Sequence, residues 1–83
     1  MARFEWTEDA LEDLRKLDRP VSRRIVKKIS WLSQHFENLT PEPLSGGFRG
    51  TFKFRIGDWR AVYTIEPGLI VIRAVGHRRE IYE

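Results

Sequence analysis

Apolar and polar residues alternate in the second half of the chain, through residues 51–56, 59–65 and 69–75. Strict alternation is typical of strands that have one buried and one exposed face. Two pairs of residues that favour tight turns, Gly57-Asp58 and Pro67-Gly68, separate these segments. The pattern therefore predicts three antiparallel strands joined by two hairpins.

Two-residue turns fix the pairing of the strands and decide which side chains share a face. Arg55 should lie opposite Arg60, and Ala61 opposite Ala74. The predicted apolar face comprises Phe52, Phe54, Ile56, Trp59, Ala61, Tyr63, Ile65, Ile70, Ile72 and Ala74. The predicted cationic face, on which we expect no Asp or Glu, comprises Lys53, Arg55, Arg60 and Arg73. Like charges directly opposite destabilise a sheet by about 0.2–1 kcal/mol, so this face is interpreted as a polyanion site, with a solvated polar face as the alternative.

Residues 7–36 follow a helical period instead. Thr7 is a good N-cap for a first helix with the apolar stripe Leu11, Leu14 and Leu17. Pro20 suits the first turn of a second helix. The core-facing stripe of that helix is Val21, Ile25, Ile29, Leu32 and Phe36. Its outer side carries a basic run that we interpret as a solvated face, with a ligand site as the alternative: Arg23, Arg24, Lys27 and Lys28.

The remaining segments complete a small α+β fold. Phe4 and Trp6 alternate with charged residues and predict a short first strand. Residues 37–50 contain two prolines and three glycines and predict a loop. The order is therefore strand, helix, helix and three strands in a single domain, residues 1–83. Each helix has one apolar side, so both should cover the apolar face of the sheet in a two-layer architecture, with the cationic face open to solvent.

Composition narrows the classes of function. The 83 residues contain no cysteine and two histidines, so neither a disulfide nor a convincing metal site is expected. No stretch approaches the roughly 20 apolar residues of a membrane span, and we expect a cytoplasmic protein. The net charge of +3 resides in the half that contains the predicted sheet: residues 1–43 are balanced, whereas residues 44–83 have an excess of Lys and Arg. A basic half favours nucleic acid as a partner.

The segment after the last predicted strand adds further candidate chemistry. We expect Gly76 to let the chain bend, bringing His77 and Arg78 towards the cationic face and leaving Tyr82 at its rim. Guanidinium and ammonium groups hold the non-bridging oxygens of a phosphodiester, and an aromatic ring stacks on a splayed base. Given charge stabilisation and proton transfer, a ribose 2′-hydroxyl can attack the adjacent phosphate without a metal ion.

The two motifs F-K-x-R-x-G-x-W-R-x-V-Y (residues 52–63) and V-G-H-R-R-E-x-Y (residues 75–82) resemble the RelE/ParE superfamily of bacterial and archaeal toxins, and more narrowly its RelE branch. This resemblance implies a microbial-RNase-like fold. It also implies an endoribonuclease that cuts mRNA in the ribosomal A site and inhibits translation. Such enzymes leave a 2′,3′-cyclic phosphate and a 5′-hydroxyl and use no metal ion or other cofactor. The implied partners are a cognate antitoxin, the ribosome and mRNA, and a toxin-antitoxin complex that binds its own operator DNA; no membrane is implied.

The resemblance also implies site residues. The catalytic positions of the family match Lys53, Arg55, Arg60, Arg78 and Tyr82. Arg60 and Arg78 would hold the phosphate, and Tyr82 would stack on a base. Arg55 departs from the usual lysine and cannot be a general base, because a guanidinium is not deprotonated in proteins. Lys53 is therefore the expected base, with His77 as the competitor. Additional RNA contacts are expected from Arg49, Arg73 and Arg79.

Two other functions fit the same sequence. The ParE branch shares the fold and poisons DNA gyrase. A noncatalytic RNA-binding module would use the cationic face without cutting RNA, and its binding would be sensitive to salt.

Overall fold

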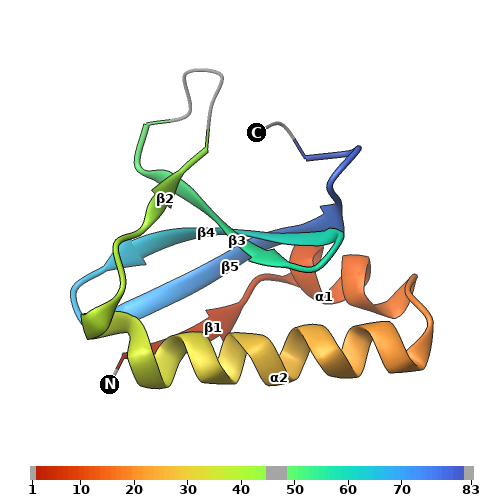
Figure 1. Ribbon diagram of the computed structural model, residues 1–83, viewed down its shortest axis with the longest axis horizontal. Coiled ribbons are helices and arrows are strands. Elements are labelled where there is room, and N and C mark those ends of the chain that lie inside the picture. Colours follow the sequence, from red (N-terminus) through yellow and green to blue (C-terminus); the bar gives the residue numbers. More distant parts are fainter. Residues whose placement is uncertain (1, 45–48, 82–83) are drawn as a thin grey trace.

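The computed structural model describes residues 2–44 and 49–81 (Figure 1). The helices are α1 (Glu8–Arg15) and α2 (Arg19–His35), followed by the 3₁₀ turn η1 (Phe36–Asn38). The strands are β1 (Arg3–Trp6), β2 (Glu42–Pro43), β3 (Thr51–Ile56), β4 (Trp59–Glu66) and β5 (Leu69–His77). Within these ranges the strands form one sheet in the order β1-β5-β4-β3-β2. β1 is parallel to β5, and the other neighbours are antiparallel.

Both helices lie on one side of the sheet, so the predicted two-layer α+β architecture is confirmed (Figure 1). Thr7 caps α1 as predicted, because its side-chain oxygen accepts a hydrogen bond from the Ala10 amide at 3.2 Å. Pro20 occupies the first turn of α2. Neither helix in the described ranges is long and apolar enough to cross a membrane.

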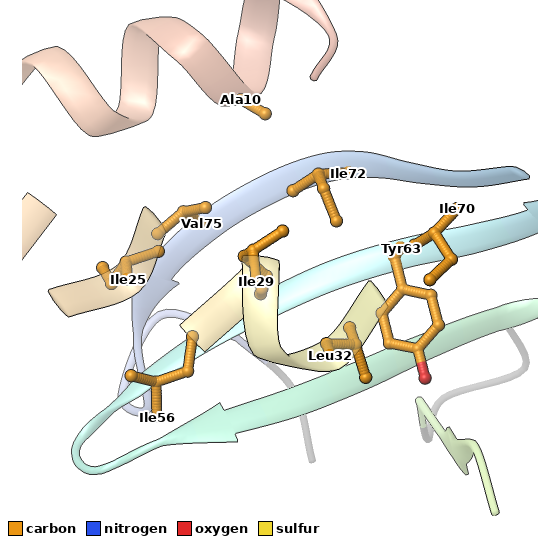
Figure 2. Close-up of a cluster of buried hydrophobic side chains, with 10 residues drawn as sticks. Ala10, Ile25, Ile29, Leu32, Ile56, Tyr63, Ile70, Ile72 and Val75 are labelled. Carbon is orange, nitrogen blue, oxygen red and sulfur yellow. The ribbon is translucent and has the colours of Figure 1, made fainter. Parts of the chain in front are cut away.

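The core fills the space between α2 and the sheet. Ile25, Ile29 and Leu32 of α2 are buried there, as their spacing predicts (Figure 2). The sheet contributes Ile56, Ala61, Tyr63, Ile70, Ile72 and Val75. From α1 the most buried side chain is Ala10, whereas Leu11 lines a hollow on the surface. The predicted stripe is therefore correct for Leu14 and Leu17, which pack against the core, but Ala10 rather than Leu11 is the buried residue of the first turns.

A β-bulge changes the predicted register of the second hairpin. Tyr63 pairs with Ile72 as expected, but Val62 pairs with Ala74 and Ala61 with Val75. Arg73 is the extra residue on β5 between these pairs. The prediction that Ala74 faces the core was therefore wrong: Val75 takes that place, and Ala74 lies on the opposite face.

The segment predicted as a loop, residues 37–50, contains regular structure at its start. It includes most of η1 and all of β2, which adds to the outer side of β3. Proline is tolerated in β2 because this strand is at the edge of the sheet. The pairing places Glu42 opposite Lys53, and the Leu44 amide donates to the Thr51 carbonyl at 2.9 Å. The prediction of a loop was wrong for this part.

The chain does not bend at Gly76, contrary to prediction. Gly76 belongs to the extended strand β5, and the turn follows at residues 78–81, on the side of the sheet away from α2 (Figure 1). A Cβ atom added at Gly76 would lie 3.2 Å from Ile81 Cδ1. Because Gly76 has no side chain, Ile81 can pack directly against the sheet at this position.

Candidate functional site: the open face of the sheet

The face of β3, β4 and β5 that points away from the helices is called the open face below. Strand pairing places Lys53, Arg55 and Arg60 on it, and Arg55 lies directly opposite Arg60 as predicted. Arg73 joins them, since its Nε donates to Thr64 Oγ1 at 3.1 Å on the same face. The predicted gathering of four cations from three strands on one face is therefore present.

The open face is less open than predicted. Lys53 and Arg60 are each only 6% exposed, and Val62 and Val71 on the same face are also buried. Arg55 and Arg73 are exposed. Part of the covering comes from Ile81, which lies over Gly76 next to Arg60. The cations thus differ in how rigidly the protein holds them.

Glu42 contributes a carboxylate to this face, so the prediction that no acid lies on it was wrong. Its Oε2 atom accepts a hydrogen bond from Arg55 Nη2 at 3.1 Å and lies 3.6 Å from Lys53 Nζ. Sequence reasoning missed Glu42 because the flanking prolines were read as loop signals. The available signal was that proline is compatible with an edge strand, which would have placed Glu42 beside Lys53.

A hollow of about 190 Å³ lies at this edge of the sheet, where β2 is only two residues long. Its lining includes Glu42, Lys53, Arg55 and Tyr63. Figure 2 shows the Tyr63 hydroxyl pointing away from the other labelled core side chains. Burial, and secondly the nearby Glu42 charge, raise the pKa of Tyr63 to about 12. The phenol therefore keeps its proton at neutral pH and can act as a hydrogen-bond donor.

Arg60 holds the β3–β4 turn together. Its Nη1 atom donates to the Gly57 carbonyl at 2.7 Å and to the Trp59 carbonyl at 2.9 Å. These bonds and its burial give Arg60 a structural role that the alternating pattern did not reveal. Its side chain is off the helix-side core, as predicted, but it is not a free surface group.

The candidate site residues from His77 onward do not all converge on the open face. His77 pairs with Trp59 and contacts its ring edge-to-face, with centroids 5.3 Å apart, on the helix side of the sheet. The Arg78 side chain is 55% exposed, and its Nε lies 3.7 Å from Asp58 Oδ1 at the β3–β4 turn. Arg49 and Arg79 are exposed. Tyr82 lies outside the described residues.

The arrangement suits the binding of an anion by side chains alone. Lys53 and Arg55 converge on a single carboxylate oxygen, Arg55 through a hydrogen bond at 3.1 Å and Lys53 through an ion pair at 3.6 Å, and the same two charges would attract a phosphate oxygen. Across residues 2–44 and 49–81, no three His, Cys, Asp or Glu side chains are grouped as metal ligands would be. The open face therefore offers electrostatic stabilisation and two neighbouring groups able to exchange protons, Lys53 and Glu42.

Comparison with known protein families identifies the family to which the chain belongs. The family model described as "ParE toxin of type II toxin-antitoxin system, parDE" matches residues 4–82. The chain belongs to this toxin family. The predicted membership of the RelE/ParE superfamily is thereby confirmed. A search of curated protein sequences found no match.

Solved structures from both branches of the superfamily are similar to the protein. The toxin-antitoxin complex RelBE2 from Mycobacterium tuberculosis contains a chain with 30% identity and a TM-score of 0.81, and the alignment covers 93% of this chain and 98% of that one. The isolated RelE toxin of E. coli has 20% identity, a TM-score of 0.73 and coverage of 93% and 84%. The chromosomal ParDE system of P. aeruginosa has 19% identity, a TM-score of 0.74 and coverage of 93% and 96%. The last two similarities concern the fold alone.

Proposed function

We propose that this type II toxin is an endoribonuclease that cleaves mRNA on the ribosome and thereby inhibits translation. The observation that carries the proposal is the position of the Glu42 carboxylate, whose oxygen lies between Lys53 and Arg55. A non-bridging oxygen of a scissile phosphate has the same charge and would replace this carboxylate at Arg55. The 30% identity to the toxin of a RelBE complex supports the ribonuclease branch.

The proposed reaction needs only groups of the protein and the RNA. The 2′-oxygen of the ribose attacks the adjacent phosphorus, the bond from phosphorus to the 5′-oxygen breaks, and a 2′,3′-cyclic phosphate and a 5′-hydroxyl result. The Lys53–Glu42 pair receives the proton of the 2′-hydroxyl and supplies one proton to the departing 5′-oxygen. Arg55 and Arg73 stabilise the negative charge that develops on the phosphate oxygens. In this proposal His77 is not the base, since its ring lies against Trp59 on the helix side.

The proposal is tested by mapping new mRNA 5′ ends on ribosomes that carry a defined mRNA, with the purified toxin. The wild-type protein should produce 5′ ends within the codon in the A site. Glu42→Gln and Lys53→Met should be compared at saturating ribosome concentration, because the variant with the larger loss identifies the member of the pair that accepts the proton. A wild-type protein that yields no new 5′ ends on programmed ribosomes would refute the proposed activity.

The ParE branch supplies the second candidate function, a toxin that poisons DNA gyrase. The family model that matches residues 4–82 carries the ParE description, which favours this candidate. The two functions predict different damage in cells that express the toxin. A ribonuclease depletes translated mRNA while chromosomal DNA stays intact, whereas a gyrase poison causes DNA breaks while transcripts stay intact. Measuring both in the same culture distinguishes them.

A cognate antitoxin is the proposed protein partner, and the outer side of the helices is its proposed docking site. A hollow of about 620 Å³ lies there, with apolar walls from Leu11, Leu14 and Val26. Val26 is 44% exposed, and the basic side chains Arg15, Arg23 and Lys27 also line the hollow. An amphipathic segment with acidic residues would fit this surface. The RelBE and ParDE structures named above come from toxin-antitoxin systems, which supports a partner of this kind.

Co-expression with the antitoxin tests the proposed docking site. Val26→Asp should abolish co-purification of the two proteins, whereas Lys16→Asp, on an exposed residue between the helices, should not. Unchanged co-purification of Val26→Asp would exclude this hollow. Binding of the assembled complex to its own operator DNA belongs to the same proposal and is read from a gel-shift assay with the DNA upstream of the gene.

A further inference from the structure

The outer side of α2 carries four cations over six residues: Arg23, Arg24, Lys27 and Lys28. All four are exposed, and α2 itself contains no Asp or Glu. No carboxylate in the part of the chain that the structure describes forms an ion pair with any of them. A surface with this much uncompensated charge attracts polyanions.

An aromatic residue lies within this basic surface. Trp31 is 39% exposed. Lys28 Nζ lies 5.6 Å from the centre of its ring, and His35 stacks against it with ring centroids 4.5 Å apart. A hollow of about 500 Å³ at this position is lined by Arg24, Lys27, Lys28, Ser30, Trp31 and Gln34. The surface thus combines cations with a ring that its neighbours hold in place.

The basic side of α2 is separate from the open face but reaches its border. α2 lies on the opposite side of the sheet from the open face (Figure 1). A Cβ atom added at Gly57 would be 3.8 Å from Arg24 Nη1, so the Arg24 guanidinium lies beside the β3–β4 turn. Arg60 holds the same turn from the open face. A strand that leaves the open face past this turn would next meet α2.

We propose that the α2 surface, defined as Arg24, Lys27, Lys28 and Trp31, binds single-stranded RNA that continues from the strand held on the open face. The proposal rests on the proposed ribonuclease function. Cations that follow the backbone and an aromatic ring that contacts bases are the usual means by which proteins bind single strands without sequence preference. The neighbouring hollow between α1 and α2 differs, because Leu11, Leu14 and Val26 make it apolar and suit it to a protein segment.

Fluorescence anisotropy with a fluorescein-labelled 20-nucleotide single-stranded RNA tests the proposal across 50–200 mM salt. The logarithm of the association constant falls with the logarithm of the salt concentration, and Arg24→Gln/Lys28→Gln should make this slope shallower by about 1.4. Each lost phosphate contact accounts for about 0.7 of the slope. Trp31→Leu should weaken binding by about fivefold with an unchanged slope, because it removes aromatic contact and no charge. The matched control is Lys16→Gln/Arg19→Gln, which removes two exposed cations outside both surfaces and should reduce the slope much less.

Two comparisons decide what a failure means. The α2 variants are repeated in an Arg55→Gln/Arg73→Gln background, in which the open face is weakened; an α2 effect that persists there supports the surface even if no cleavage activity is found. No change in affinity or slope for the α2 variants in either background overturns the inference and leaves the ribonuclease proposal untouched. Two further results also overturn the inference. Binding of a 20-base-pair RNA duplex as tight as that of the single strand would indicate a site for duplex backbone. Competition by poly-L-glutamate that is the same for the wild type and Trp31→Leu would indicate a site for an acidic protein. Circular dichroism confirms the folding of each variant.

Discussion

The open face of the sheet and the outer side of α2 are both cationic, but the cations of the open face have bonding partners within the protein and those of α2 are exposed. On the open face, Lys53 and Arg55 share Glu42, and Arg60 is bonded to the turn carbonyls. On α2, Arg24 and Lys28 project from an exposed helix without a carboxylate partner among the described residues. Internal bonds hold a side chain in one geometry, which chemistry requires, whereas exposed cations bind diffusely. The difference distinguishes the site proposed for the cleavage reaction from the surface proposed for RNA attraction.

The largest expected effect concerns Lys53. Lys53→Met keeps most of the side-chain volume in a position that is 6% exposed but removes the ammonium group beside Glu42. If the proposed ribonuclease uses this group for proton transfer, the cleavage rate at saturating ribosome concentration should fall by about 10²- to 10⁴-fold. The measurement is single-turnover cleavage of mRNA on programmed ribosomes.

Lys16→Met provides the matched control for Lys53→Met, because it removes the same charge from an exposed position outside both cationic regions. Its cleavage rate should stay within about twofold of the wild type. If both variants lose activity to the same degree, total charge determines the rate, and the distinction between a reactive face and an attracting face fails.

The next effect separates two arginines that face each other on the open face. Arg60→Ala removes two hydrogen bonds from a buried guanidinium to turn carbonyls, and bonds of charged groups contribute about 1.5–3 kcal/mol each. We expect the free energy of unfolding to fall by at least about 3 kcal/mol. Arg55→Ala removes only an exposed ion pair and should change it by less than about 1 kcal/mol. Urea unfolding of both variants tests this, and equal losses would contradict the structural role of Arg60.

Local patterns predicted the first hairpin correctly because the Gly57-Asp58 turn fixes every pair of β3 and β4. They failed where one residue is added to a strand. The bulge at Arg73 turns Val75 rather than Ala74 towards the core, and the alternating pattern does not show where such an extra residue is placed. Helix α2 was predicted well for the same reason as the hairpin, since its stripe of apolar residues alone determines the buried side.

The candidate site was predicted in part for a related reason. Strand alternation brought Lys53, Arg55 and Arg60 onto one face, because that requires only neighbouring strands. Glu42 comes from a segment eleven residues away from Lys53 whose pairing depends on the tertiary fold. The side on which His77 lies likewise depends on the register after the bulge, which sequence reasoning did not place. Side chains brought together by long-range pairing are those that the sequence alone leaves undetermined.

A pH dependence of stability should arise from Tyr63 in the hollow next to the open face. Its pKa in the folded protein is raised from 10.0 to about 12, so the folded state holds the phenolic proton more tightly than the unfolded state. This contribution to stability is fully present below pH 10 and is lost as the pH rises from 10 to about 12, at up to about 1.4 kcal/mol per pH unit. Urea unfolding at pH 9 and pH 11 should show the wild type losing about 1 kcal/mol more than Tyr63→Phe. Equal losses would mean that Tyr63 ionises normally in the folded state.

The smallest expected effect concerns the contact between Ile81 and Gly76, where the turn after β5 covers part of the open face. Among the described residues, no segment covers the cations of α2 in this way. Alanine at position 76 would place Cβ 3.2 Å from Ile81 Cδ1, and such overpacking costs about 1 kcal/mol or more. Replacing glycine in a strand also stabilises the folded state by about 0.5–1 kcal/mol through the lost freedom of the unfolded chain. Since Ile81 belongs to a turn near the chain end that can shift, the two terms should nearly cancel in Gly76→Ala. In an Ile81→Ala background the clash is absent, so adding Gly76→Ala should raise the free energy of unfolding by about 0.5–1 kcal/mol. A double-mutant cycle measured by urea unfolding gives this coupling, and a value of zero would mean that Ile81 does not cover Gly76 in solution.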